Sequence, residues 1–315
     1  QNAGTDAYNT AVGWEAGKLI STGVKNTLIG STAGDALTIG NYNTALGFDA
    51  LSTSVDGDYN TAIGYLALRL YEDGDGDGFN TAVGANAMGS ATTAQFNTSL
   101  GYNSLGGATL TGDYNIAIGY NAGTGMTSGT NNTLIGSNAG DALTTGGNNV
   151  AIGKSALSTE DTGYGSVAIG TYALEDQDAG NAYNTAVGHE TGRDITSGLY
   201  NTLIGAYSGD ALTTGGNNTA VGYQALSAED GNGNNTAIGY QTLNAQNAGA
   251  DAYNVAVGHQ AGLLVSTGTY NTLIGGNAGD ALTTGSRNVA VGFNALTSED
   301  GHGYNTAIGY DSLKS

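Results

Sequence analysis

The chain has 315 residues, including 55 Gly, no Pro and no Cys, and only 11% of its residues are charged, against roughly 25% in ordinary soluble domains. Its formal net charge is −20 with only seven Lys and Arg, which argues against a nucleic-acid partner because phosphate neutralisation requires a basic surface. The absence of Cys excludes disulfides and thiolate metal sites, and no stretch approaches the ~18 apolar residues of a membrane span.

One phrase, Asn-Thr-Ala-(Val/Ile)-Gly, recurs along the whole chain at intervals of 17 to 20 residues. Three residues after the Asn stands Val, Ile or Leu, and four residues after it stands Gly. This strict period argues against low-complexity disorder, and we expect residues 1–315 to form a single repeat domain. The Asn, or the equivalent position, defines 18 units at Asn9, Asn26, Asn43, Asn60, Asn80, Asn97, Asn115, Asn132, Asn149, Ser166, Asn184, Asn201, Asn218, Asn235, Asn254, Asn271, Asn288 and Asn305.

The residue types within each unit predict the fold. Thr, Val and Ile at alternating positions favour a short strand, and the following Gly permits a sharp bend. A unit of about 17 residues is too short for a helical-hairpin repeat, which needs roughly 33 residues, and it suits one coil of two or three short strands. Stacked coils would place the Val/Ile column inside and a hydrogen-bonded Asn column along the stack at about 4.8 Å per coil. The sequence therefore predicts an all-β, parallel β-solenoid (β-roll or β-helix) of about 18 coils.

A second, longer period extends over four successive units. Eight residues after the Asn, two successive units have Gly and the next two have Leu, as at Gly17, Gly34, Leu51 and Leu68. Units with Gly carry an apolar residue three places later, such as Ile20. We therefore expect one wall of the core to change shape every two coils.

Several units resemble known surface-protein repeats. "NTAVGYQAL" at residues 218–226 and "NTAIGYQTL" at residues 235–243 resemble repeats of phage tail-fibre and adhesin-like surface proteins. "SVAIG" at residues 166–170 is similar to the head repeats of trimeric autotransporter adhesins. The resemblance implies a left-handed parallel β-roll, usually trimeric, displayed outside the cell or virion.

The two ends of the sequence match an internal junction. Residues 1–8, "QNAGTDAY", nearly duplicate residues 246–253, and residues 305–315 align with residues 235–245. One copy followed by another would continue the repeat, so we expect copies to stack head to tail in a contact that does not close. The alternative is a fragment cut at a repeat boundary. The expected interface comprises Gln1, Asn2, Tyr8, Leu313, Lys314 and Ser315.

An acidic insertion is the candidate metal site. Asp73, Asp75 and Asp77 alternate with Gly, an arrangement that lets several carboxylates surround a hard cation such as calcium. The alternative is a solvated acidic turn. No other cofactor is expected. No Ser/His/Asp set or general acid–base pair stands out from the repeat, so we expect no enzymatic activity.

Aromatic residues recur at two positions, one before the Asn and one after the Gly. Exposed aromatic side chains could bind surface glycans, and stacking between coils is the alternative. The candidates from the second position are Tyr65, Tyr102, Tyr120, Tyr223 and Tyr240.

These patterns favour a structural subunit of an extracellular filament or fibre that assembles with copies of itself. A second hypothesis is a trimeric adhesin head or phage tail-fibre segment that binds a surface receptor or glycan. Ice binding is a third hypothesis, although each unit offers only one dependable Thr, as at Thr10 and Thr27. All three place the chain outside the cell or on a cell or virion surface.

Overall fold

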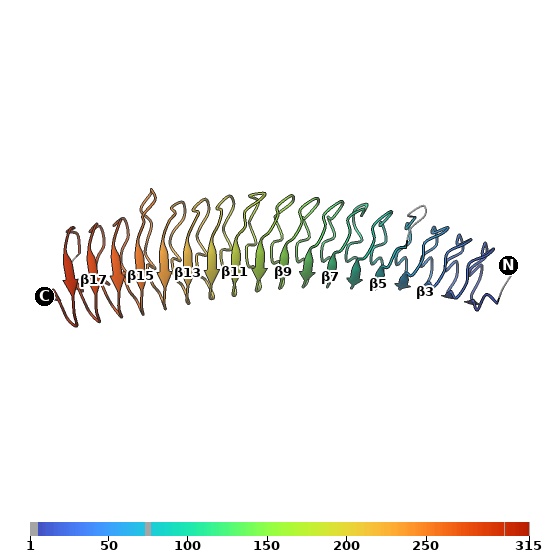
Figure 1. Cartoon of the computed structure of the whole chain (residues 1–315), viewed down its shortest axis with the longest axis horizontal. Helices are drawn as coiled ribbons and strands as arrows, with labels where there is room; N and C mark the ends of the chain where they lie inside the picture. The colour runs from blue at the N-terminus through green and yellow to red at the C-terminus, as the bar shows by residue number, and fades with distance from the viewer. Residues whose placement is uncertain (1–5, 73–76, 299, 315) are drawn as a thin grey trace. The chain divides into compact units, whose positions relative to one another are not determined.

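The computed structural model describes residues 6–72, 77–298 and 300–314. The chain divides into two compact units, Gln1–Thr162 (unit 1) and Gly163–Ser315 (unit 2). Each unit is a parallel β-solenoid of nine three-residue strands (Figure 1), which confirms the predicted fold class. No helix in the described part of the chain is long and apolar enough to cross a membrane.

The strands of unit 1 are β1 (Thr10–Val12), β2 (Thr27–Ile29), β3 (Thr44–Leu46), β4 (Thr61–Ile63), β5 (Thr81–Val83), β6 (Thr98–Leu100), β7 (Ile116–Ile118), β8 (Thr133–Ile135) and β9 (Val150–Ile152). Those of unit 2 are β10 (Val167–Ile169), β11 (Thr185–Val187), β12 (Thr202–Ile204), β13 (Thr219–Val221), β14 (Thr236–Ile238), β15 (Val255–Val257), β16 (Thr272–Ile274), β17 (Val289–Val291) and β18 (Thr306–Ile308).

Each described coil contributes one named strand rather than the expected two or three. The remainder of the coil turns repeatedly through left-handed backbone conformations, which interrupt extended structure. In the coil of β13, for example, Asn217 has φ +59°, Gln224 has φ +52° and Leu226 has φ +56°. These bends limit regular pairing to three residues per coil, and that pairing is in register from one coil to the next, as between Ala220 and Ala237.

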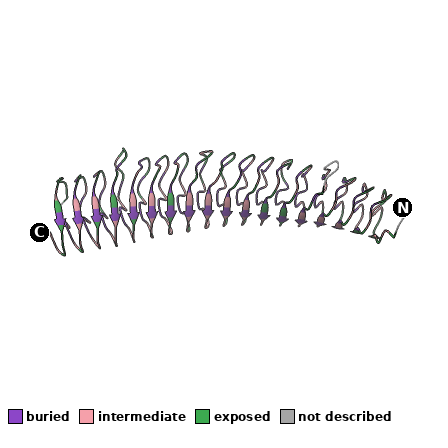
Figure 2. Cartoon of the chain, in the orientation of Figure 1, coloured by how far each residue is buried: buried purple, intermediate pink, exposed green. Residues whose placement is uncertain are grey.

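The middle residue of every strand from β2 to β18 is buried in the core, and the predicted interior Val/Ile column is wrong. Ala237 is fully buried, whereas the next residue, Ile238, is 38% exposed. Because side chains alternate along a strand, the first and third residues both point outward once the second points inward. In Figure 2 the strands carry both buried and more exposed residues. The core is therefore built from the central Ala or Leu and from turn residues such as Leu226.

Complementary side-chain volumes explain the second period. Leu203 stands at the centre of β12, where neighbouring strands have Ala. A Cβ atom built on Gly192 would lie 2.8 Å from one Leu203 methyl carbon, and one built on Gly209 would lie 3.0 Å from the other. Because interiors are close-packed, the larger strand residue requires Gly in the turns that it contacts. We call coils with Gly eight residues after the Asn of the buried column Gly coils, and coils with Leu there Leu coils. Two successive Gly coils thus provide the space for one Leu at the centre of a strand.

A buried column of Asn side chains joins successive coils, as predicted. The backbone N–H of Asn218 donates to Asn201 Oδ1 at 3.0 Å, and Asn201 Nδ2 donates to the Gly215 carbonyl at 2.9 Å. Asn201 is only 1% exposed. Each such Asn therefore satisfies backbone groups that the short strands leave unpaired in the interior.

We expect Gly205→Ala to destabilise the fold by about 3 kcal/mol. Gly205 has φ +129°, and an added Cβ atom would lie 2.5 Å from the Gly222 carbonyl oxygen of the next coil. Gly180→Ala is the matched control, because Gly180 has φ +66° but no atom within 4 Å of the added Cβ, and it should cost only about 1 kcal/mol. Urea unfolding measures both, and equal losses would contradict the role of close coil approach.

Asn201→Ala should cost about 3 kcal/mol, because it leaves the Asn218 N–H and the Gly215 carbonyl buried without partners. Asn201→Asp keeps an acceptor for Asn218 but places a buried carboxylate against the Gly215 carbonyl, and we expect a loss at neutral pH at least as large as that of Asn201→Ala. Unfolding of the three proteins in urea gives the comparison. An Asn201→Ala protein as stable as the original would refute the structural role of this column.

Candidate functional site

The outward side of the strands forms a continuous surface in each unit, which we call the strand face. Each coil contributes four residues to it: the residue before the column Asn, the first and third strand residues, and the residue after the Gly. For the coil of β4 these residues are Tyr59, Thr61, Ile63 and Tyr65. None of the 27 Asp and Glu occupies any of these positions along the chain, and the cations there are Lys25, Lys154 and Arg287. No carboxyl group therefore belongs to a strand-face position, although Asp6 accepts a hydrogen bond from Tyr8 and Glu190 lies 3.6 Å from His189 at the edge of the face.

The aromatic residues before the column Asn form the first ring column. In unit 1 they stack without interruption over five coils, with ring centroids 4.8, 4.9, 5.2 and 4.9 Å apart in the order Tyr42, Tyr59, Phe79, Phe96 and Tyr114. Both faces of the Tyr59 ring are thus covered by neighbouring rings, while 42% of the residue stays exposed. This column presents ring edges and hydroxyl groups to its surroundings rather than ring faces.

The aromatic residues after the Gly form the second ring column, which contains the candidate glycan-binding residues. Tyr65 stacks on Phe48, Tyr102 on Tyr120, and Tyr223 on Tyr240, each with centroids 5.6 Å apart. The five candidates are 43–57% exposed and lie on the strand faces of their units. Stacking between coils is therefore present, and glycan binding by these residues stays a prediction.

Cations extend the first ring column where aromatic residues are missing. Lys25 Nζ donates to the Tyr42 hydroxyl at 2.9 Å and lies 4.7 Å from the centre of the Tyr42 ring. The hydrogen bond to Tyr42 raises the pKa of Lys25. In unit 2 the Arg287 guanidinium lies 5.4 Å from the rings of both Tyr270 and Tyr304. These contacts are cation–π interactions, so the positive charges are part of the columns.

The predicted calcium loop is only partly described. Asp73 and Asp75 lie outside the described residues, and Asp77 is exposed and forms an isolated parallel bridge with Asp58. Calcium binding by this loop stays a prediction.

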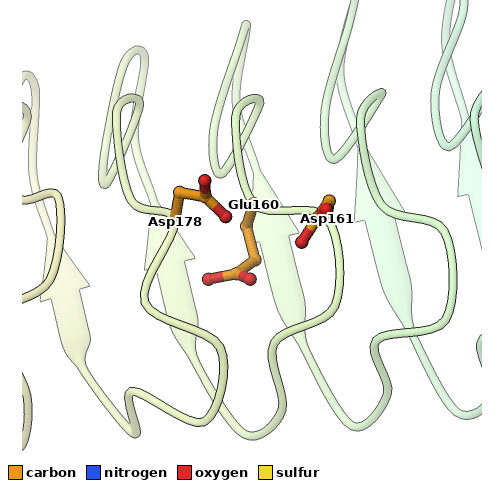
Figure 3. A group of neighbouring side chains, drawn as sticks. All are labelled: Glu160, Asp161 and Asp178. Atoms are coloured by element: carbon orange, nitrogen blue, oxygen red, sulfur yellow. The ribbon is translucent and has the colours of Figure 1, made fainter.

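Another acidic pair lies on the turn after β9. Glu160 is buried and Asp161 is exposed, and their carboxylate oxygens lie within 4.8 Å of each other. Figure 3 draws this pair together with Asp178, which follows β10 and belongs to unit 2.

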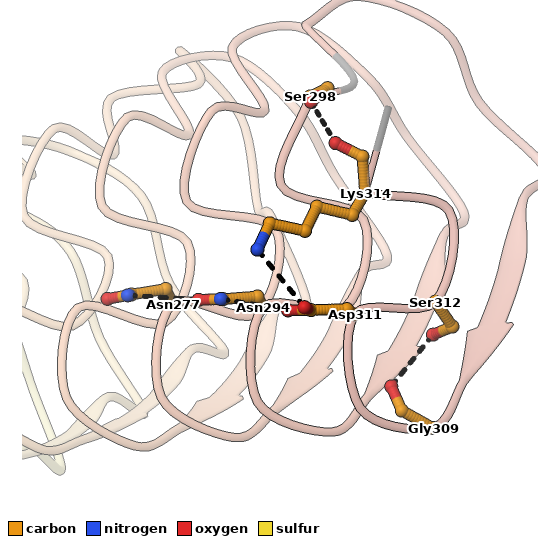
Figure 4. Close-up of polar contacts among 7 residues, drawn as sticks. All are labelled: Asn277, Asn294, Ser298, Gly309, Asp311, Ser312 and Lys314. Atoms are coloured by element: carbon orange, nitrogen blue, oxygen red, sulfur yellow. Dashed lines mark hydrogen bonds and ion pairs between the residues drawn. The ribbon is translucent and has the colours of Figure 1, made fainter.

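The expected head-to-tail residues are also described only in part. Tyr8 is 71% exposed and Leu313 is 55% exposed. Lys314 forms an ion pair of 3.1 Å with Asp311 (Figure 4). The expected interface residues outside the described part of the chain are Gln1, Asn2 and Ser315.

An amide column on the turns ends at Asp311 in Figure 4. Asn277 Nδ2 donates to Asn294 Oδ1 at 3.2 Å, and Asn294 Nδ2 donates to Asp311 Oδ1 at 2.9 Å. The Asn294 hydrogen bond, with a further contribution from Lys314, lowers the pKa of Asp311. The coil of β18 is therefore tied to its neighbours through side chains as well as through strand pairing.

Sequence reasoning missed a buried polar position eleven residues after the column Asn. In the Gly coils this position holds core residues such as Leu212, whereas Glu229 and Gln246 occupy it in the two coils that follow, and both are fully buried. Gln246 Oε1 accepts a hydrogen bond of 2.7 Å from Asn254 of the column. The signal was available in the sequence, because Ser54, Glu160, Gln177, Glu229 and Gln246 stand at this position in coils with Leu eight residues after the Asn, where coils with Gly have apolar residues.

Glu229 lacks the partners that its Gln counterparts have. Its Oε1 accepts the Asn232 N–H at 3.1 Å, but Oε2 has no partner among the described residues, and neither does Asn235 Nδ2. Burial is the main reason that the pKa of Glu229 rises to about 7. Burial likewise raises the pKa of Asp210 to about 6. The core of unit 2 thus holds a carboxyl group that favours its protonated form.

Comparison with protein-family models found no match, and comparison with curated proteins found no similar sequence. Folds of this class present extended surfaces and are typical of structural proteins.

Raising the pH from 5 to 8 should lower the stability of unit 2 through Glu229. Its folded-state pKa of about 7 lies above the ordinary value of 4.5, so the folded state binds the proton more tightly and stability falls as the pH rises between these values. The full shift corresponds to about 3 kcal/mol. Urea unfolding at both pH values measures the loss.

Glu229→Gln is the matched variant, because Gln246 occupies the equivalent position in the next coil. It should remove most of the pH dependence between pH 5 and 8 and leave the smaller contribution of Asp210, which has the same sign. An unchanged pH dependence in the variant would contradict the assignment to Glu229.

Proposed function

We propose that this chain is a non-enzymatic structural subunit of an extracellular filament or fibre, in which copies stack end to end. One observation supports the proposal: coils of different sequence pair through the same backbone register. The strand sequences Thr-Ala-Val and Thr-Leu-Ile pair in β11 and β12, and Val-Ala-Val pairs with Thr-Leu-Ile in β15 and β16. Because the contact depends on backbone groups and on the Asn column, one coil is complementary to a coil of another copy.

Such a contact is heterologous, since the two surfaces that meet are opposite sides of a coil. A heterologous contact between parallel coils does not close into a ring, so it extends into a filament. Unpaired strand edges are strong templates for pairing with another chain. The extracellular setting rests on composition, because a net charge of −20 without Cys suits a surface exposed to salty water and needs no redox protection.

Electron microscopy and fibre diffraction of the 315-residue chain test the proposal. We expect thin filaments and a meridional reflection near 4.8 Å, the spacing of hydrogen-bonded strands. Strand β18 pairs with β17 through one edge, and in the proposed filament its other edge pairs with the next copy. Thr306→Pro removes a backbone N–H from β18 and should therefore shorten or abolish the filaments. Thr306→Val is the control, because β17 has Val at the equivalent position, and it should assemble normally.

Discrete particles under all conditions, or filaments that Thr306→Pro leaves intact, would refute end-to-end stacking through strand edges. Adding a calcium chelator tests the acidic loop separately. Loss of filaments in chelator would support calcium binding by Asp73, Asp75 and Asp77, whereas unchanged filaments would argue against a structural calcium ion there.

A second candidate is an adhesin head or tail-fibre segment, and the exposed strand face supports it. In that case the solenoid would display the second ring column to a surface glycan, and the assembly would be a homotrimer. A solution mass of three chains, together with glycan binding that Tyr223→Ala weakens, would favour this candidate over the filament.

A further inference from the structure

The strand face of unit 1 is larger than the apolar patches of ordinary monomers. Its aromatic residues in the two ring columns are 40–71% exposed, from Phe96 at the low end to Tyr8 at the high end. Since a fully buried aromatic side chain covers about 150–250 Å², these rings leave roughly 1,000 Å² exposed. The largest apolar patch on a typical monomer is about 300–600 Å², and a stable interface needs about 800 Å² per partner. One unit therefore exposes enough area for a stable interface.

The same face is rigid. Successive strands of unit 1 pair without a slip in register, as at Thr44 with Thr61 and Ile116 with Thr133, so equivalent side chains align in straight columns. The stacked rings are held by their neighbours, with interplanar angles of 4–7° along Tyr42, Tyr59 and Phe79. A partner would therefore immobilise few side chains, which lowers the conformational entropy lost on binding.

Charge restricts which sides of two copies can approach. Each chain carries a net charge of −20, and no Asp or Glu occupies a strand-face position; the carboxylates of Asp6 and Glu190 reach its edge at Tyr8 and His189. A contact through any acidic side would bury unpaired carboxylates at a high desolvation cost. The strand face is the surface on which two such chains can meet without that cost.

The spacing of the columns identifies the occupant. Rows of Thr, Val or Ile and aromatic side chains repeat along the face at the strand spacing of about 4.8 Å. A second strand face has the same spacing, so its rows can interdigitate over many coils, whereas a partner with another period would lose register after a few. We propose that two copies of this chain pair through their strand faces in an isologous contact, with the sheets about 10 Å apart.

This lateral contact is separate from end-to-end stacking, and sedimentation velocity distinguishes them. We expect the original chain to form a dimer with a lower frictional ratio than an end-to-end pair would have. The double variant Leu46→Glu/Leu100→Glu places carboxylates on the strand face, at residues 43% and 47% exposed. It should weaken the dimer at least about 100-fold, because like charges would be buried together.

Ile39→Glu is the matched control, because Ile39 is 50% exposed on a turn outside the strand face. It should dimerise like the original chain. Circular dichroism and urea unfolding establish that all three proteins are folded to the same extent.

Three results would overturn the proposal: an original chain that stays monomeric at high concentration, a mass of three chains, or a double variant that dimerises as tightly as the control. Filaments of single width in electron microscopy, unaffected by the double variant, would refute lateral pairing while leaving end-to-end stacking intact. Compact dimers without filaments would support lateral pairing and refute end-to-end stacking.

Discussion

The close approach of successive backbones at the Gly after each strand is the constraint on which the structure depends. The described glycines at this position have φ between +129° and +144°, a region that L side chains rarely adopt. At Gly205 an added Cβ atom would lie 2.5 Å from the Gly222 carbonyl oxygen of the next coil, well inside van der Waals contact. Because this contact fixes the direction in which each coil leaves its strand, the Asn column and the turns can repeat in register over coils whose other residues differ.

With the backbone path fixed in this way, the side chains of the core can vary if their total volume is conserved between neighbouring coils. Leu203 fills space that Gly192 and Gly209 leave open, and the Leu coils reverse the arrangement by placing Leu226 on the turn. The polar position occupied by Glu229 follows from this exchange, because Leu226 supplies the apolar volume that other coils obtain three residues later. The repeat therefore constrains the total volume of neighbouring side chains in the core rather than the volume of each side chain separately.

The period, the short strand, the bend at Gly and the Asn column could all be predicted from the sequence, because each has one physical interpretation. The direction of the strand side chains could not. In Thr236-Ala237-Ile238 both Ala and Ile are apolar, and a three-residue alternation has two phases of similar hydrophobicity. The structure places the second strand residue inside whether it is Ala237 or Leu203, and the residues of the adjoining turns adjust to its volume. The positive φ angles of Leu226 and Gln224 could not be predicted either, because neither residue type favours that conformation.

The aromatic columns were visible in the sequence, but their chemistry depends on ring orientation. Stacking along the coil axis covers both faces of first-column rings such as Tyr59, whereas the second-column candidate Tyr65 stacks on Phe48 on one side and meets Ala85 at the equivalent position of the next coil. The candidate glycan-binding residues therefore lie in short runs of stacked rings, and their role stays a prediction.

The proposed end-to-end contact and the proposed lateral contact should differ in how they depend on salt concentration. Pairing along the coil axis uses backbone hydrogen bonds and the Asn column, which bear no net charge and respond weakly to salt. Both contacts bring together chains of net charge −20, but pairing between strand faces holds the chains side by side over many coils. The repulsion that salt screens over a Debye length of about 8 Å at physiological ionic strength is therefore larger in the lateral contact. Added salt therefore strengthens the lateral contact more than the axial contact. As a result, the thickness of an assembly should increase with ionic strength more steeply than the length of the assembly does.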